Sequence, residues 1–201
     1  MKKLLIFTIF FTLVQGIYAQ KFEFKNSDWA DSVFNSLTRQ QRVAQLFMVD
    51  AFTDPSQDNI QKVAELIKKY GIGGVIFFKG TPIRQAYATN YLQSISPIPL
   101  LIGIDGEWGL SMRLDSTLKF PRQMGIGAIP DEKLLKEMGR IVARNCKTLG
   151  IHVNFAPDAD INNNANNPVI GDRSFGEHKS LVTIKSLAYL AGMQEEGLLT
   201  T

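Results

Sequence analysis

Short apolar runs alternate with amphipathic helical segments along this chain, and this alternation constrains the fold more than any other feature. Continuous apolar strands are expected at 46–49, 74–78, 99–104 and 151–155, with a further strand beginning near 198. Between them, apolar residues recur at helical spacing over 60–70, 83–91, 134–149 and 180–196. Because the strands are apolar on both faces, the pattern predicts a parallel sheet covered by helices, which is an α/β fold.

Boundary signals support several of these helices. Thr38 has Gln41 three residues later, which is the spacing of a capping box at a helix start. Thr81 and Pro82 form a cap and first-turn pair, and Gly71 is placed to end a helix. Two architectures fit this order, a doubly wound sheet and a (β/α)₈ TIM barrel. No Gly-x-Gly-x-x-Gly follows the first strand, which weakens the dinucleotide-binding form of the doubly wound sheet.

The first residues have the layout of a secretory signal peptide. Lys2 and Lys3 precede an apolar run over 4–14, and Ala19 ends the segment on a small residue. The run is shorter than the roughly 20 residues that span a bilayer. We therefore expect 1–19 to be removed on export to the periplasm or the extracellular space, with no stable membrane insertion afterwards. An uncleaved membrane anchor is the alternative, and 20–36 is expected to be a lead-in with a short helical pattern.

Composition, charge and cysteine content limit which partners and bonds this chain is expected to have. The chain is 45% hydrophobic and 20% charged, which is ordinary for a globular domain. Its net charge of +3 includes Lys2 and Lys3, and no cluster of Lys or Arg follows them, so nucleic acid is not an expected partner. Cys146 is the single cysteine, which excludes an internal disulfide, and its place on an apolar helix face predicts a buried hydrophobe.

Polar residues stand where each strand is expected to end. These residues are Asp50, Lys79-Gly80, the segment from Asp105 to Gly109, and Asp158-Ala159-Asp160. Ligands of parallel α/β folds bind at this end of the strands, so the sequence predicts a polar, acid-lined rim. Carboxylates suit a polyol ligand because they accept hydrogen bonds from several hydroxyl groups. A metal is the alternative, but His152 and His178 lack ligand spacing, and His152 is expected inside a strand as a core histidine.

Two loops carry most of the functional signal. The first runs from Asp105 to Arg113, where two glycines allow a sharp turn after a strand. It is either a ligand-binding loop or a glycine-rich loop held by an Asp–Arg pair with no ligand role. The second covers 162–176, is rich in Asn, Pro and Gly, and contains Arg173. Long loops in compact domains are usually functional.

These segments resemble the N-terminal barrel of glycoside hydrolase family 3, and its β-N-acetylhexosaminidase branch most closely. The matching stretches include IDGE at 104–107, GIHVNFAP at 150–157 and NPVIGDRSFG at 167–176. Together with weaker matches they cover nearly all of 37–201 in the order of the family. The resemblance implies a (β/α)₈ barrel of which about the first four to five βα units are present.

The resemblance also implies roles for individual residues. Asp105 corresponds to the aspartate that holds the outer hydroxyl groups of the sugar in the −1 subsite, and Arg113 and Arg173 match arginines around that subsite. Glu107 and Asp160 are expected to support them. Trp108 departs from the family, which commonly has a glycine there. It either stacks on a sugar face or wedges the loop against the barrel.

The resemblance further implies an exported enzyme that removes terminal β-linked N-acetylglucosamine without a cofactor or metal. Its histidine acid/base and its aspartate nucleophile correspond to positions beyond Thr201, so no catalytic residue is expected within this chain and no turnover by the 201-residue polypeptide. An open half-barrel should also expose its apolar inner face and self-associate. The alternatives are a β-glucosidase of the same family, a non-catalytic carbohydrate-binding half-barrel, and an unrelated metal-dependent barrel enzyme.

Overall fold

The computed structural model describes residues 27–201, so the expected signal peptide over 1–19 lies outside the described residues. The part from Arg39 to Thr201 is one compact unit, and the residues up to Thr38 belong to a separate one. Within the earlier unit, helix α2 (Ser27–Ser36) confirms the helical pattern expected in the lead-in. In the described part, none of the helices combines the length and the apolar character needed to cross a membrane.

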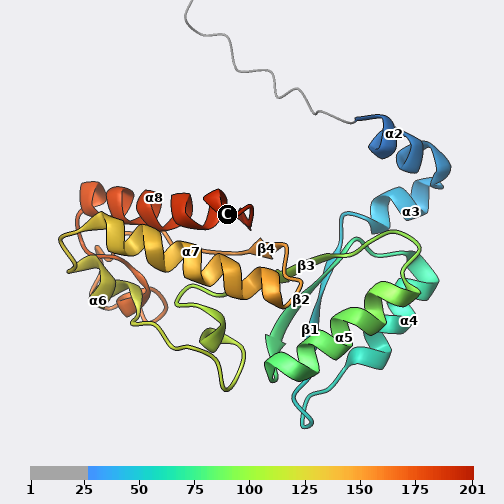
Figure 1. The fold of residues 1–201 in the computed structure, drawn as a ribbon, viewed down its shortest axis with the longest axis horizontal. Helices are drawn as coiled ribbons and strands as arrows, with labels where there is room; N and C mark the ends of the chain where they lie inside the picture. The colour runs from blue at the N-terminus through green and yellow to red at the C-terminus, as the bar shows by residue number, and fades with distance from the viewer. Residues whose placement is uncertain (1–26) are drawn as a thin grey trace, which may run out of the picture. The chain divides into compact units, whose positions relative to one another are not determined.

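Five parallel strands form one sheet in the order in which they occur along the chain (Figure 1). They are β1 (Met48–Phe52), β2 (Gly74–Lys79), β3 (Leu101–Ile104), β4 (Val153–Asn154) and β5 (Leu199–Thr200). A doubly wound sheet reverses its strand order at a switch point, whereas a barrel adds each new strand beside the previous one. The sequential order therefore agrees with the first part of a (β/α)₈ barrel.

Helix α3 precedes the first strand, and the other helices of this unit connect the strands and cover one face of the sheet. They are α3 (Arg39–Ala44), α4 (Ile60–Tyr70), α5 (Pro82–Ile95), α6 (Gln123–Gly127), α7 (Glu132–Thr148) and α8 (Lys179–Glu195). In Figure 1, α4 and α5 lie beside β1 and β2, and α7 and α8 lie together at the other side of the unit. Several expected boundaries are confirmed: Gly71 ends α4 with φ 69°, and the Thr81 side chain accepts a hydrogen bond from the Arg84 backbone N–H.

The hydrophobic core lies between the sheet and the helices. Alternate strand residues point into it, among them Ala51, Val75, Phe77, Ile102 and Ile104, and all of these are fully buried. Their neighbours on the opposite face are less covered: Leu101 is 40%, Phe155 36% and Leu199 58% exposed. The expected exposure of an apolar inner face is therefore confirmed, and β1 and β5 are the two edges of the described sheet.

Two expectations about strands were wrong. Strand β1 begins at Met48, because the backbone N–H groups of Leu46 and Phe47 still donate to carbonyls of the preceding helical turn. Asp50 therefore lies inside β1, exposed on the less covered face, and does not follow the strand. His152 precedes β4 and is exposed, and its Nδ1 accepts a hydrogen bond from the Ile102 N–H at 3.0 Å. It is hydrogen-bonded, but it is not the core residue that the sequence predicted.

The connection between β3 and α7 is more elaborate than the sequence indicated. It contains the short 3₁₀ helix η1 (Leu110–Met112) and α6, neither of which was expected. A second short helix, η2 (Gly171–Arg173), lies in the loop between β4 and α8. Their few residues give too little apolar periodicity to be recognised in a sequence. These two long connections carry most of the predicted site residues.

Candidate functional site

Asp105 and Arg113 form an ion pair at the carboxyl end of β3. Asp105 directly follows the strand, and η1 returns the chain so that Arg113 Nη2 lies 2.6 Å from Asp105 Oδ2. The Arg113 guanidinium also stacks over the ring of Phe78, 4.6 Å from its centroid. Both charged side chains remain partly exposed. The Asp–Arg pair that the sequence suggested is therefore present, and the Asp105 carboxylate and the Arg113 guanidinium remain accessible to a ligand.

Arg173 connects three segments at the same end of the sheet. Its Nη2 lies 2.7 Å from Glu107 Oε1 and 3.1 Å from Asp158 Oδ2, and its Nε donates to Glu107 as well. The hydrogen bonds to Glu107 are the main reason why the pKa of Arg173 is raised above its ordinary value. Because Glu107 is buried, the arginine compensates a charge that would otherwise be costly. This places Glu107 in a supporting position beneath Arg173.

Asn154 holds the loop that begins with Asp105. This fully buried residue ends β4, and its Oδ1 accepts a hydrogen bond from the Gly106 N–H at 2.8 Å. Its Nδ2 donates to the Gly106 carbonyl oxygen at 3.2 Å, so one side chain satisfies both polar groups of that residue. A Cβ at Gly106 would lie 3.1 Å from the same Oδ1, so a side chain there would press against the Asn154 amide. Sequence reasoning missed Asn154, although an amide inside an apolar strand signals a specific partner.

Asp160 lies next to the Arg173 cluster in a tight turn. Its backbone N–H donates to Asp158 Oδ1 at 2.9 Å, and its carbonyl oxygen accepts from the buried Ser174 hydroxyl at 2.6 Å. The exposed Asp160 carboxylate also contributes to the raised pKa of Arg173. Asp158 is thus the closer acid and contacts Arg173 directly, whereas the sequence had singled out Asp160.

The ring of Trp108 contacts the charged side chain of Arg122. The guanidinium of Arg122 lies 4.7 Å from the centre of its ring, and Arg122 Nη1 lies 2.8 Å from Asp172 Oδ2. The indole is half-buried. The ring therefore packs against a residue of the same β3–α7 connection, and both roles, a wedge against the barrel and a contact with a sugar, stay predictions.

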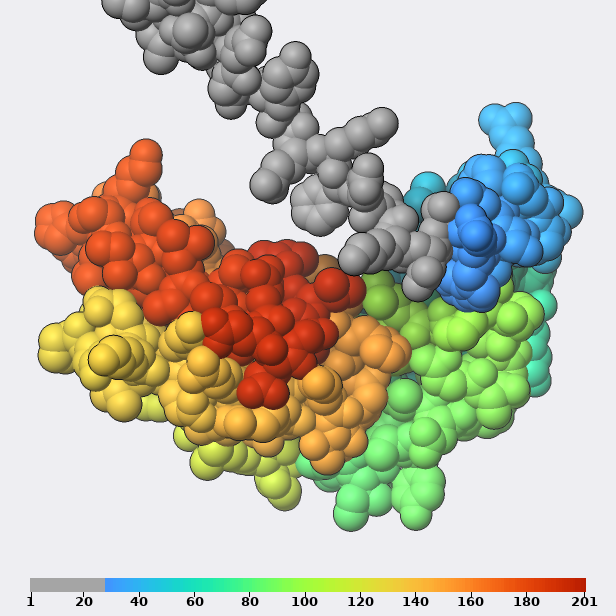
Figure 2. Space-filling model, turned by 45° about the horizontal axis from the view of Figure 1, so that its top comes forward, coloured from blue at the N-terminus to red at the C-terminus, as the bar shows by residue number. Residues whose placement is uncertain are grey.

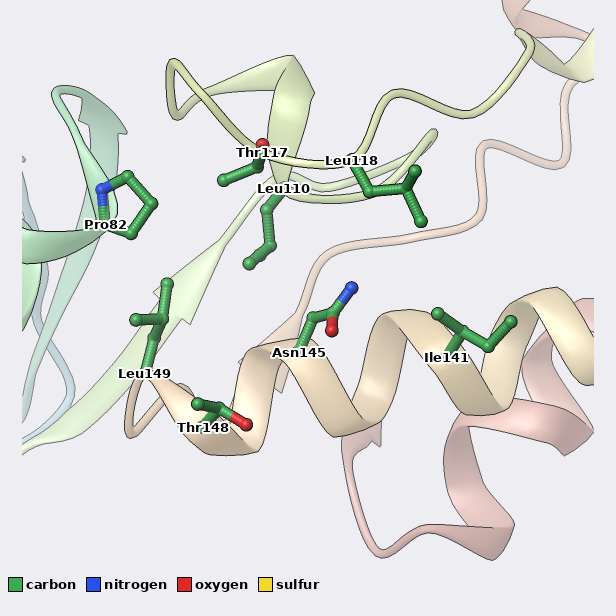
Figure 3. Close-up of a pocket in the computed structure, with 8 residues that line it drawn as sticks. All are labelled: Pro82, Leu110, Thr117, Leu118, Ile141, Asn145, Thr148 and Leu149. Atoms are coloured by element: carbon green, nitrogen blue, oxygen red, sulfur yellow. The ribbon is translucent and has the colours of Figure 1, made fainter.

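A cavity of about 320 Å³ lies outside this rim, between α7 and the loop that follows β3 (Figure 3). Figure 3 shows Leu110, Thr117 and Leu118 of the loop facing Ile141 and Asn145 of α7. None of the predicted sugar-binding residues lines it. Among the residues that the structure describes, no group of three His, Cys, Asp or Glu side chains could hold a metal ion.

Comparison with known proteins agrees with this geometry. Residues 38–201 match the family described as glycosyl hydrolase family 3 N-terminal domain. A β-hexosaminidase A from Pseudoalteromonas piscicida is 36% identical over 69% of this chain and 25% of its own length. A β-hexosaminidase from Mycobacterium tuberculosis is 28% identical over 67% of this chain and 36% of its own length. The chain thus spans well under half the length of these relatives.

Solved structures show the same fold. A family 3 β-N-acetylglucosaminidase from Paenibacillus has a TM-score of 0.72 and 34% identity, covering 82% of this chain and 32% of that one. A β-glucoside phosphorylase has a TM-score of 0.79 and 26% identity, covering 86% of this chain and 31% of that one. These matches confirm the α/β fold with a parallel sheet that was expected from the sequence. The chain belongs to glycosyl hydrolase family 3, whose N-terminal domain it matches from residue 38 onward.

Proposed function

We propose that the protein containing this chain hydrolyses terminal β-linked N-acetylglucosamine, and that residues 37–201 supply part of its sugar-holding surface. The observation that carries the proposal is the arrangement of Asp105, Arg113 and Arg173 at adjacent strand ends, each in a charged pair. Carboxylate and guanidinium groups held in this way can form charged hydrogen bonds to the hydroxyl groups of one ring. The similarity to a solved structure named as a family 3 β-N-acetylglucosaminidase supports N-acetylglucosamine as the sugar, and relatives named β-hexosaminidases agree with it.

In this proposal the described residues orient the sugar and do not cleave it. Retaining hydrolysis needs a nucleophile and an acid/base group, and the family resemblance assigns neither to residues 37–201. The contribution of the rim is to fix the ring so that its anomeric carbon meets groups from the rest of the barrel. The 201-residue polypeptide is therefore proposed to bind sugar without turnover. Reading the encoding DNA beyond codon 201 tests whether the histidine acid/base and the aspartate nucleophile that the resemblance implies are encoded there.

The test compares chromogenic substrates on the full-length protein. We expect p-nitrophenyl N-acetyl-β-glucosaminide to be cleaved with a higher kcat/KM than the corresponding β-glucoside. Asp105→Ala should lower kcat/KM by about a hundredfold or more, because a misplaced ring reacts far more slowly. Glu65→Ala, which removes an exposed carboxylate from α4, is the matched control and should leave kcat/KM unchanged. Equal rates for wild type and Asp105→Ala would contradict the proposal.

Action on β-glucosides is the second candidate. It is favoured by the similarity in fold to a β-glucoside phosphorylase, and by a relative from Cellulomonas fimi named β-N-acetylglucosaminidase/β-glucosidase, 26% identical over 85% of this chain. A higher kcat/KM on the glucoside would select this candidate. Running both substrates with and without inorganic phosphate separates hydrolysis from phosphorolysis, because phosphorolysis produces a sugar phosphate.

We also propose that the protein is exported and acts on cell-wall or host glycans, including fragments derived from peptidoglycan. The proposal rests on the signal-peptide pattern of residues 1–19 in the sequence. Export predicts a mature protein that begins near Gln20, which N-terminal sequencing of the secreted fraction would detect. Retention of Met1 on a cytoplasmic product would contradict it.

A further inference from the structure

A second cavity opens between α4 and α5, apart from the rim residues. Its volume is about 470 Å³, within the roughly 300–1,000 Å³ of small-molecule sites. It is lined by Thr53, Asp58, Ile60, Gln61, Arg84, Tyr87, Ala88 and Tyr91. Thr53 directly follows β1, and most of the other lining residues lie in or just before the first turns of the two helices. One end of the groove therefore lies near the carboxyl end of β1, and the groove continues along α5 to Tyr91.

Two tyrosines give this groove an aromatic surface. Tyr87 is 74% exposed, although a phenol ring of this size is usually covered. Tyr91 is half-buried beside it on α5, and its hydroxyl lies 3.4 Å from Gln61 Oε1 on α4. The face of an aromatic ring carries negative partial charge, so it attracts the C–H groups on the apolar face of a pyranose ring. The exposed ring of Tyr87 thus provides a platform for a sugar.

Charged and amide side chains line the groove together with the two tyrosines. The Arg84 side chain donates a hydrogen bond from Nη1 to the Thr53 carbonyl oxygen at 3.3 Å, and a guanidinium has five N–H donors in all. Asp58 uses Oδ1 to accept from the Ile60 N–H at 3.0 Å, and a carboxylate has lone pairs for further partners. Vicinal hydroxyl groups of a sugar both donate and accept. The groove therefore offers hydrogen-bond donors and acceptors in the same lining as the two aromatic rings.

Two other cavities lack this combination of side chains. The cavity beside α7 is lined by aliphatic and small polar residues, and a cavity between α3 and α4 is lined mainly by apolar ones. Neither has a charged side chain in its lining. Only a mixed surface can satisfy the polar groups of a sugar while it covers the apolar ring face.

We propose that the groove between α4 and α5 is a secondary glycan-binding site that holds part of a β-linked oligosaccharide away from the reaction site. This inference rests on the proposed function, because it assumes that the protein meets β-linked glycans. A second point of attachment would keep a polymeric substrate near the rim by raising its effective concentration. Binding at the groove requires no reaction, so it can be measured separately from turnover.

The test measures binding of the β-1,4-linked tetramer of N-acetylglucosamine to the full chain by saturation-transfer NMR titration. All groove variants are made in an Asp105→Asn background, which weakens binding at the rim. Tyr87→Ala should raise the Kd about fivefold by removing the aromatic platform. Tyr87→Phe keeps the ring and should bind as its parent does. Ile83→Ala is the matched control, because Ile83 is 70% exposed on the same helix but does not line the groove.

The outcomes show whether the groove, the rim or neither binds the tetramer. A loss of binding with Tyr87→Ala, together with unchanged binding for Tyr87→Phe and Ile83→Ala, supports the groove site. If Tyr87→Ala binds as well as Ile83→Ala does, the groove proposal is overturned, and a loss of binding caused by Asp105→Asn alone still supports the rim. If no variant changes the Kd of the tetramer, or if the chain does not bind the tetramer at all, both sites are contradicted.

Discussion

At the scale of single residues, the site depends on side chains that contact no ligand themselves. Asn154 satisfies both the N–H and the carbonyl oxygen of Gly106, the residue after Asp105. It also donates to the Met193 sulfur at 3.4 Å, which links the loop to α8. Because all of these groups are buried, losing the amide would leave polar backbone atoms without partners. Asn154 is therefore a positioning residue for Asp105.

Replacing Asn154 with leucine tests this role. Asn154→Leu keeps a similar volume but removes the hydrogen bonds, and we expect the free energy of unfolding to fall by about 2–4 kcal/mol. Urea denaturation measures this loss, with Asn90→Leu on the exposed side of α5 as the control. In conditions where both variants are folded, Asn154→Leu should also weaken binding of N-acetylglucosamine. Equal urea midpoints for the two variants would contradict a stabilising role for the hydrogen bonds of Asn154.

The residues of the site could be predicted from sequence only in part. The Asp105–Arg113 pair was open to prediction because the two residues share one short loop. Arg173 and Glu107 are 66 positions apart, and nothing local in either segment indicates that they meet. The contact arises because adjacent parallel strands bring their following loops to one end of the sheet. Their roles in binding sugar stay predictions until kinetic data test them.

At the scale of elements, α7 and α8 pack closely side by side, as their orange and red surfaces show in Figure 2. Exposed ion pairs join them, among them Arg140 to Glu195 at 2.6 Å. Two glycines allow the close approach. A Cβ at Gly192 would overlap the Lys136 carbonyl oxygen, and a Cβ at Gly139 would overlap that of Tyr189. The backbones themselves are in contact, so neither helix can move aside cheaply.

Adding one methyl group at this crossing should therefore separate the helices. Gly192→Ala is expected to lower the free energy of unfolding by about 1–3 kcal/mol or more, because backbone atoms cannot rotate out of the way. The matched control is Gly125→Ala in α6, where a Cβ would meet only Pro121 at 3.8 Å. That variant should be neutral or stabilised by up to about 1 kcal/mol through helix propensity. Thermal unfolding measures both, and equal melting temperatures would rule out a tight crossing.

The elements themselves were largely predictable, and the exceptions have physical causes. The ends of α4 and α5 follow from Gly71 and from Thr81-Pro82, because these residues specify local backbone geometry. The predicted start of β1 was wrong because Leu46 and Phe47 are apolar and were assigned to the strand. Both residues are exposed, and their backbone N–H groups bond to the preceding helical turn. Apolar character alone does not distinguish a strand from the end of a helix.

At the scale of the unit formed by 39–201, the sheet has one covered face and one open face. Leu101 of β3, Leu199 of β5 and Phe155, which directly follows β4, lie on the open face. The sequence could predict this arrangement, because strands that are apolar on both faces need cover on both. It could not predict which polar residues share the open face, and Asp50 of β1 is one of them.

The open face and the two sheet edges predict how the 201-residue chain behaves in solution. Exposed apolar surface and unpaired strand edges favour association, so we expect light scattering after gel filtration to show oligomers that increase with concentration. Replacing Leu101 and Leu199 together with lysine should shift the chain toward the monomer, because charges oppose stacking of the open faces. The control is Leu187→Lys, because Leu187 is as exposed as Leu199 but lies on α8, and this variant should associate as the unchanged chain does. A monomer at every concentration, with cooperative melting, would mean that the open face does not drive association, and the exposed leucines would then need another explanation.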